Sequence, residues 1–262
     1  MHNFEFSKPS TLAEALKALA KPGAQALSGG QTLIPTMKAR LAEADALVSL
    51  TGIGELKGVC RNGDELAIGG ATPHAVVAKE AASHFPALAD LAGGIGDPAV
   101  RNRGTIGGSL ANNDPAACYP AAVLGSGASV VTNKRKIAAD DFFEGMFATA
   151  LEAGEIITGV NFPIPKKAAY VKFNQPASRF ALCGVFVSQG ASGVRVAITG
   201  ASEGGVFRWK EAEAALTKDF SPKAIEALSL PAKGMISDLH GTGAYRAHLA
   251  KVLTGRAVAQ AR

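Results

Sequence analysis

The chain has 262 residues, of which 47% are hydrophobic and 19% charged, and it carries a formal net charge of +5. This composition excludes a disordered chain, and scattered basic residues with only 6% aromatics argue against nucleic-acid binding. No apolar run approaches the 18 residues of a membrane span, and Glu5 and Glu14 interrupt any secretion signal, so we expect a cytoplasmic protein.

The cysteines and histidines do not form a metal-binding pattern. Cys60, Cys118 and Cys183 are far apart and no CxxC occurs, so the chain offers neither an iron–sulfur nor a zinc ligand set. The simplest interpretation is three reduced, buried thiols. No two of the five histidines have metal-ligand spacing, and we expect His74 and His248 at the surface. We therefore predict no metal site.

The first part of the chain predicts alternating short helices and strands. A capping box of Thr11 and Glu14 opens a helix at 10–20. A β-α-β unit follows, with a turn after residue 27, a helix over 33–44 and a strand over 46–50. Further segments are predicted as strands at 65–70, 128–132 and 155–163, and as helices at 71–82, 85–96, 119–127 and 140–151.

The pattern changes after the "PIPKK" segment. Apolar, glycine-punctuated segments at 168–174, 180–190, 193–201 and 204–209 predict an antiparallel meander, and helices are predicted at 210–218, 221–230 and 243–262. Strands followed by helices indicate a separate domain. Residues 163–168 are the best place for its boundary.

Two glycine loops lie between apolar segments: "ALSGGQTLIP" at 26–35 and "RNRGTIGGSLANND" at 101–114. Glycine in a regular element costs about 0.5–1 kcal/mol relative to alanine, so paired glycines indicate positive φ or a close approach to the backbone. Converging N–H groups of such turns can bind an anion, and further donors are available from Ser28, Gln31, Thr32, Thr105, Ser109 and Asn112. Neither loop has Rossmann or Walker spacing. One loop alone is typical of a structural turn, whereas the two together favour a dinucleotide pyrophosphate.

The order of the segments "GGQTLIPTMKARL", "DPAVRNRGTIGGSLANNDPAA", "DFFEGMFATALEAGEIITGVNFP" and "AAYVKF" resembles the FAD-binding medium subunit of the molybdenum hydroxylases. That family includes the middle subunit of aerobic carbon monoxide dehydrogenase and the flavin domain of xanthine dehydrogenase. The resemblance covers essentially the whole chain and implies an α+β fold. It implies a two-subdomain FAD-binding domain of the vanillyl-alcohol-oxidase (p-cresol methylhydroxylase) type at 1–165, with subdomains 1–55 and 56–165. A small C-terminal domain of antiparallel sheet and helices follows at 166–262, of the carbon monoxide dehydrogenase flavoprotein type.

The resemblance also implies which residues hold FAD, in a non-covalent manner. Both glycine loops hold the pyrophosphate in the family, which gives Leu27, Ser28, Gly29, Gly30, Gln31, Thr32 and Ile34 from the first loop and Thr105, Ile106, Gly107, Gly108 and Ser109 from the second. Further positions carried over are Ile95, Asp114, Ile157, Lys172 and Phe180. Lys172 is the candidate for tuning the flavin potential, and Ile95 and Phe180 are the candidates for covering the ring.

Four positions depart from the family pattern. Gln31 stands where many members have histidine and Ser109 where most have asparagine, and both remain hydrogen-bonding residues. Cys118 falls where many members have a cofactor-binding aspartate, so a contact to FAD is lost there. Arg179 falls on an acidic position. If its side chain points inward it should raise the flavin potential; a solvated turn is the alternative.

The implied function is that of an FAD-carrying electron-transfer subunit in a molybdenum-containing hydroxylase or dehydrogenase. A small partner subunit with [2Fe-2S] clusters delivers electrons, and FAD passes them to an external acceptor. A large partner subunit holds the molybdenum cofactor and the substrate, in a heterotrimer or a dimer of heterotrimers. Two alternatives stay open: a self-contained FAD-dependent oxidase and an FAD-free assembly subunit.

Overall fold

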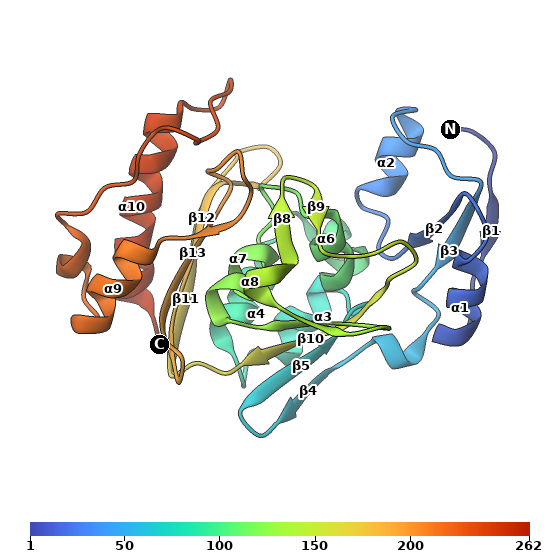
Figure 1. The fold of residues 1–262 in the computed structure, drawn as a ribbon, viewed down its shortest axis with the longest axis horizontal. Helices are drawn as coiled ribbons and strands as arrows, with labels where there is room; N and C mark the ends of the chain where they lie inside the picture. The colour runs from blue at the N-terminus through green and yellow to red at the C-terminus, as the bar shows by residue number, and fades with distance from the viewer.

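The computed structural model describes residues 1–262, which are arranged as three successive parts along the long axis of the molecule (Figure 1). The first part is a three-stranded parallel sheet in the order β1-β3-β2 with two helices. Its elements are β1 (Glu5–Ser7), α1 (Leu12–Leu19), β2 (Ala24–Leu27), α2 (Leu33–Lys38) and β3 (Ala46–Ser49). The predicted capping box is present, because Thr11 accepts from the Glu14 backbone and Glu14 reaches back to Thr11. The predicted β-α-β unit is confirmed.

The middle part is built on an antiparallel five-stranded sheet in the order β4-β5-β10-β6-β7. A 3₁₀ turn (Gly54–Leu56) leads into it. Its strands are β4 (Val59–Asn62), β5 (Glu65–Gly69), β6 (Ser129–Thr132), β7 (Lys136–Ala138) and β10 (Ile157–Pro163), and β8 (Phe143–Gly145) and β9 (Ala148–Thr149) form a separate hairpin. Its helices are α3 (His74–Glu80), α4 (Pro86–Gly93), α5 (Pro98–Arg103), α6 (Ile106–Asn112), α7 (Tyr119–Ser126) and α8 (Ala139–Phe142).

The last part is an antiparallel four-stranded meander with two helices against one face. It comprises β11 (Lys167–Asn174), β12 (Ala181–Gly190), β13 (Gly193–Thr199), β14 (Phe207–Arg208), α9 (Lys210–Lys218), a 3₁₀ turn (Pro222–Ile225) and α10 (Gly243–Gln260). Helices α9 and α10 contact this sheet on one side, and α4 and α7 contact it on the other. The predicted meander is confirmed, and the α+β fold class with it.

Strand β12 shows how the layers are held together. Phe186 belongs to the 30-residue core around α4, α7 and the five-stranded sheet, whereas its neighbours Val185 and Val187 belong to the 20-residue core under α9 and α10. Successive side chains of a strand point to opposite faces, so a strand covered on both faces is apolar throughout. A third core of seven residues, including Val48 and Ile156, joins the first part to the middle part.

Three predicted helices are shorter than expected or absent. The helix after the first loop ends at Lys38, because Arg40 adopts a φ of 60°. Residues 140–151 form one helical turn and the β8–β9 hairpin, whose backbone bends at Phe147 with a φ of 57°. Residues 221–230 contribute only a 3₁₀ turn, because the Ser221 hydroxyl bonds the Asp219 carboxylate and does not cap a helix. No helix of the chain is long and apolar enough to cross a membrane.

Candidate functional site: a cavity between three parts of the chain

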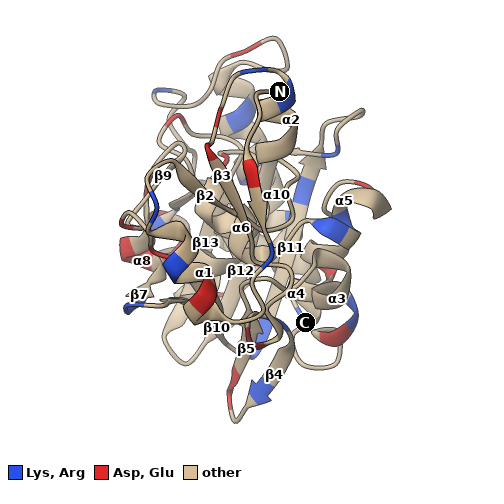
Figure 2. Cartoon of the chain, turned by 90° about the vertical axis from the view of Figure 1, so that its right-hand side faces the viewer, with Lys and Arg blue, Asp and Glu red and all other residues tan.

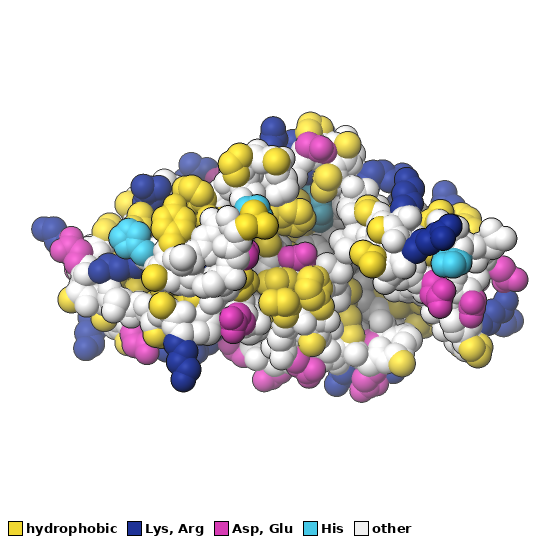
Figure 3. All heavy atoms as spheres, turned by 90° about the horizontal axis from the view of Figure 1, so that it is seen from above, with side chains coloured by type: hydrophobic (Ala, Val, Ile, Leu, Met, Phe, Trp, Pro, Cys, Tyr) yellow, Lys and Arg dark blue, Asp and Glu magenta, His cyan; other side chains and the backbone are white.

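A cavity of about 410 Å³ lies where the three parts of the chain meet. Its wall includes the loop after β2, the segment from Ile95 to Cys118, the start of β10, and Lys172 with the β11–β12 loop. In the space-filling view from above, the surface is hollowed between the amino-terminal part on the right and the rest of the molecule (Figure 3). Ligand pockets of small molecules and cofactors have volumes of this order, and a cavity assembled from several parts is a typical place for one.

Most of the residues predicted from the sequence line this cavity. They are Leu27, Ser28, Gly29, Gly30, Gln31, Thr32, Ile95, Thr105, Gly107, Gly108, Ser109, Asp114, Ile157, Lys172 and Phe180. Ile34 and Ile106 do not line it. Ile34 lies on α2 with its side chain beneath Gly30, and Ile106, the first residue of α6, is fully buried in the central core. These two predicted contacts are therefore not made by the side chains.

The first glycine loop presents a run of free backbone donors. None of the N–H groups of residues 28 to 33 donates a hydrogen bond within the chain. Gly30 has a φ of 70°, a left-handed conformation that favours glycine and turns the loop back on itself. Unpaired N–H groups that follow one another in such a turn are suited to an anion.

The second glycine loop differs, because the helix that begins there already uses its first donors. The Gly107 N–H donates to Gly70 O at 2.9 Å, and the Gly108 N–H donates to Thr105 Oγ1 at 3.2 Å. The N–H groups of Ile106 and Ser109 are likewise bonded within the chain. The Ser109 hydroxyl lines the cavity and makes no hydrogen bond within the chain. The second loop thus contributes the Ser109 hydroxyl and part of the cavity wall, whereas the free backbone N–H groups come from the first loop.

The two loops pack directly against each other. Ser28 Oγ and Thr105 Oγ1 are 2.7 Å apart and share a hydrogen bond. A Cβ atom on Gly29 would collide with the carbonyl oxygen of Arg103 and would lie 2.6 Å from Gly104 Cα. Gly29 is therefore required for the close contact between the two loops, whereas Gly30 is required for the turn.

Lys172 and Arg179 bring positive charge to the cavity wall. Lys172 Nζ donates to Gly94 O and Arg179 O, each at 2.8 Å, and lies 3.5 Å from Cys118 Sγ. Its three donors are therefore occupied, and it acts on a ligand through its charge rather than through a hydrogen bond. Arg179 is exposed, follows the turn at residues 176–178 and is among the residues that line the cavity.

His74 is buried in the cavity wall, which corrects the expectation of a surface residue. It is 5% exposed, its ring lies 5.2 Å from that of Tyr119, and its Nδ1 has no hydrogen-bond partner. Burial lowers the pKa of His74 to about 4, and the charge of Arg101 acts in the same direction. The imidazole is therefore neutral near pH 7 and presents an unsatisfied nitrogen.

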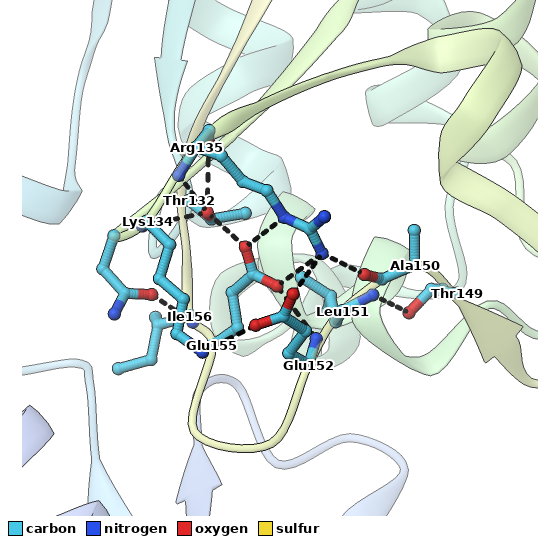
Figure 4. Close-up of polar contacts among 10 residues, drawn as sticks. Thr132, Lys134, Arg135, Thr149, Ala150, Leu151, Glu152, Glu155 and Ile156 are labelled. Carbon is cyan, nitrogen blue, oxygen red and sulfur yellow. Dashed lines mark hydrogen bonds and ion pairs between the residues drawn. The ribbon is translucent and has the colours of Figure 1, made fainter.

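An ion pair between the exposed Arg135 and the covered carboxylate of Glu155 holds the segment that leads into β10, residues 150–156 (Figure 4). The Glu155 carboxylate accepts from Thr132 Oγ1 at 2.6 Å, from Arg135 Nε at 3.1 Å and from the Glu152 N–H at 2.8 Å. Arg135 also donates to Ala150 O. The hydrogen bond from Arg135 is the main reason that the pKa of Glu155 is lowered to about 2. Since Leu151, Glu155, Ile156 and Ile157 line the cavity, this network fixes one of its walls.

The cysteines also differ from expectation. Cys60 is exposed, whereas Cys118 and Cys183 are buried as predicted. Burial raises the pKa of Cys183 to about 12, so it stays a thiol. Cys118 lines the cavity beside Lys172.

Several lining residues were not identified from the sequence, including Leu50, Gly70, His74, Glu155 and Ile156. The Gly69–Gly70 pair was a usable signal, because a Cβ on Gly70 would collide with the Ile157 carbonyl oxygen. Leu50 and Ile156 are ordinary apolar residues in an apolar context, and nothing local distinguishes them from core residues.

The comparisons with known proteins agree with this geometry. Residues 2–165 match the family model described as the FAD binding domain in molybdopterin dehydrogenase. The carbon monoxide dehydrogenase medium chain of Afipia carboxidovorans is 33% identical, over 99% of this chain and 97% of its own length. The nicotine 6-hydroxylase medium subunit of Paenarthrobacter nicotinovorans is 34% identical, over 98% of this chain and 96% of its own length.

Solved structures show the same fold over the whole chain. A chain of quinoline 2-oxidoreductase from Pseudomonas putida 86 superposes with a TM-score of 0.88 at 29% identity, covering 99% of this chain and 96% of that one. A chain of the Cu,Mo-CO dehydrogenase superposes with a TM-score of 0.85 at 30% identity, covering 98% of this chain and 96% of that one. The protein described here therefore belongs to the family of FAD-binding medium subunits of molybdenum hydroxylases.

Proposed function

We propose that this chain holds FAD in the cavity between its three parts and passes electrons from [2Fe-2S] clusters of a partner subunit to an external acceptor. The observation that carries the proposal is the run of unpaired N–H groups at residues 28 to 33, placed at a cavity whose wall also includes Lys172 and Arg179. An FAD molecule has a pyrophosphate anion in its middle, which matches the unpaired N–H groups. Its ring becomes more negative on reduction, which matches the positive charges.

The residues present fit FAD. The N–H groups of Ser28, Gly29 and Gly30 and the free hydroxyl of Ser109 can donate to the pyrophosphate. Lys172 and Arg179 add positive charge to the wall, which also includes Ile95 and Phe180.

FAD, when bound, supplies the two-electron redox chemistry, and the chain's own residues bind it and adjust its potential. Lys172 is held in place by Gly94 O and Arg179 O, so its charge stays at a fixed position. A fixed cation favours the more negative, reduced ring and raises the potential. The half-exposed Phe180 and the partly buried Ile95 shield the ring from water.

The partners that we propose are a large subunit with the molybdenum cofactor and a small subunit with [2Fe-2S] clusters, as a heterotrimer or a dimer of heterotrimers. The names of the relatives support this, because they are medium chains or subunits of dehydrogenases and hydroxylases. The chain has three cysteines, spaced far apart in the sequence, whereas a [2Fe-2S] cluster held by thiolates takes four, which fits clusters on a partner subunit.

The experiment is to mix the FAD-loaded chain anaerobically with its small subunit, reduced beforehand, and to follow flavin absorbance by stopped flow. We expect the flavin band to bleach while the cluster absorbance recovers. Bleaching only by an organic substrate, with no partner present, would instead support a self-contained oxidase. A chain that joins its partners but takes up no FAD would support an assembly role.

A further inference from the structure

A second, smaller hollow of about 340 Å³ adjoins the FAD cavity at Gly96 and Arg179, and we call it the arginine recess. One wall comes from the end of α4 and from α5, with Gly96 and Arg101, and the other from the β11–β12 loop, with Asn174, Gln175 and Arg179. Gly96 and Arg179 line both hollows, so the recess opens beside the site proposed for the flavin ring. Apart from Pro176, its wall is glycine backbone and polar side chains.

The charges around the recess have no counter-charge. Arg101 Nη1 donates to the carbonyl oxygens of Ile95 at 3.0 Å and Gly96 at 2.9 Å, which fixes its guanidinium group. Neither Arg101 nor Arg179 lies within 4.0 Å of a carboxylate, and the side chain of Arg179 makes no hydrogen bond. Figure 2 shows the basic residues of α5 at the side of the molecule. Positive charges without carboxylate partners repel one another and attract anions.

The loop that carries Arg179 is held in a strained shape. Arg179 has a φ of 62°, a conformation that residues other than glycine adopt rarely. Two hydrogen bonds close the loop, from the Arg179 N–H to Gln175 O at 2.9 Å and from the Gln175 N–H to Phe180 O at 2.8 Å. Lys172 Nζ ties this loop to the opposite wall by donating to both Arg179 O and Gly94 O. Backbone strain that neighbouring contacts maintain is concentrated at ligand clamps and functional sites.

We propose that the arginine recess binds the anionic group, a phosphate or a carboxylate, of the small molecule that takes electrons from the flavin. Arg101 and Arg179 hold this group and thereby place the acceptor beside the ring. One cycle transfers two electrons from the reduced ring to the acceptor, and the protons of the reduced ring go to the acceptor or to water. The inference rests on the proposed function, because it assumes that the larger cavity holds FAD.

The test uses the full chain loaded with FAD, reduced anaerobically with a stoichiometric amount of dithionite and mixed with an oxidant in a stopped-flow instrument. The probes are hexacyanoferrate(III), a trianion, and tris(phenanthroline)cobalt(III), a trication. Each ion takes one electron, so two ions reoxidise one flavin. At low ionic strength we expect Arg101→Gln and Arg179→Gln each to slow the trianion reaction by about five- to tenfold and not to slow the trication reaction.

Three comparisons make this result specific. Arg61→Gln removes the same charge from the exposed β4 strand, outside both hollows, and should leave both rates unchanged. Arg179→Lys keeps the charge and should keep most of the trianion rate. Hexacyanocobaltate(III), a redox-inert trianion, should bind the wild-type chain saturably in calorimetry and should not bind the Arg101→Gln, Arg179→Gln double variant.

The outcomes separate this inference from the function on which it rests. If FAD does not bind or is not reduced, the proposed function fails. If FAD is bound and reduced but Arg61→Gln slows the trianion reaction as much as the recess variants do, the recess has no special role. Absence of saturable hexacyanocobaltate(III) binding to the wild-type chain would also overturn the inference.

Discussion

Gly30 illustrates how a single residue serves the site. Its φ of 70° turns the first loop, and the N–H groups on either side of it are free of partners within the chain. A Cβ at this position would lie 3.1 Å from Ile34 Cγ1 and 3.3 Å from Leu27 Cδ1, so a side chain would be both crowded and strained. The geometry of the donors therefore depends on the absence of a side chain here.

We predict that Gly30→Ala lowers the free energy of unfolding by about 1 kcal/mol and weakens FAD binding at least tenfold. Gly63→Ala is the matched control, because Gly63 has a φ of 61°, no neighbours around its Cβ position, and a place outside the cavity. Urea denaturation should show a loss of stability in both variants, larger in Gly30→Ala because its Cβ also meets Ile34 and Leu27, and FAD titration should show an altered affinity only in Gly30→Ala. Equal FAD affinity for Gly30→Ala and the wild type would contradict the role of this loop.

Lys172 tests the electrostatic role of the positive charge in the cavity wall. Lys172→Met removes a charge that two carbonyl groups hold in place, so we predict a flavin midpoint potential lower by about 20–60 mV. Lys172→Arg keeps the charge and should shift the potential less. Spectroelectrochemical titration of the FAD-loaded chain measures both values. An unchanged potential in Lys172→Met would mean that this lysine only ties the walls together.

Among the structural elements, the segment 150–156 shows most clearly how a wall of the cavity is fixed. Glu155 has a fully buried side chain, whereas Glu152 is 57% exposed although it contacts the same arginine. Exposed ion pairs contribute little, whereas a change at the covered carboxylate of Glu155 weakens or removes the hydrogen bonds that Thr132, Arg135 and the Glu152 N–H donate to it. The two glutamates thus provide a comparison within one loop.

We predict that Glu155→Gln lowers the free energy of unfolding by about 1–3 kcal/mol and weakens FAD binding, while Glu152→Gln changes the stability by less than about 1 kcal/mol. The folded-state pKa of Glu155 is lowered from 4.5 to about 2. Its stabilising contribution is therefore complete above about pH 4.5 and is lost as the pH falls toward 2. Denaturation at several pH values should show this dependence in the wild type and a weaker one in Glu155→Gln.

The elements also show what the sequence could and could not predict. Thr11 and Glu14 define a helix start by themselves, and the apolar run of β12 is readable because both faces of the strand are buried. The β8–β9 hairpin was predicted as helix, because its shape depends on Asn113, whose side chain donates to Gly145 O and Ala148 O from more than 30 residues away. Contacts over such sequence separations leave no local signal.

In the candidate site, too, residues marked by a local pattern could be predicted, and residues placed by distant contacts could not. The glycine loops and Lys172 were identified because a motif or a family resemblance marks them. His74 is expected at the surface because a histidine in a first helical turn is usually exposed. Its burial depends on the contact of its ring with Tyr119 and on the packing of α3 against α4 and α5, which no local pattern indicates. The first N–H groups of α6 are already bonded to Thr72, Gly70 and Thr105. Only the fold shows this.

At the scale of the whole molecule, the basic residues of the chain are dispersed over the surface rather than gathered into a stripe (Figure 2). The cavity, in contrast, has walls from all three parts of the chain. A ligand that contacts all three parts stabilises their arrangement. At 100 times its Kd, FAD should add about 2.7 kcal/mol to the free energy of unfolding, because it binds only the folded chain. The division of the chain at residue 165 into two domains stays a prediction.

The measurement that tests the central claim most directly is an absorption titration of the purified chain with FAD, before and after dithionite. We predict flavin bands near about 370 and 450 nm that stay with the protein on gel filtration, bleach on reduction and leave on denaturation. A chain that remains colourless in excess FAD, both alone and with its partner subunits, would contradict the assignment of the cavity to this cofactor.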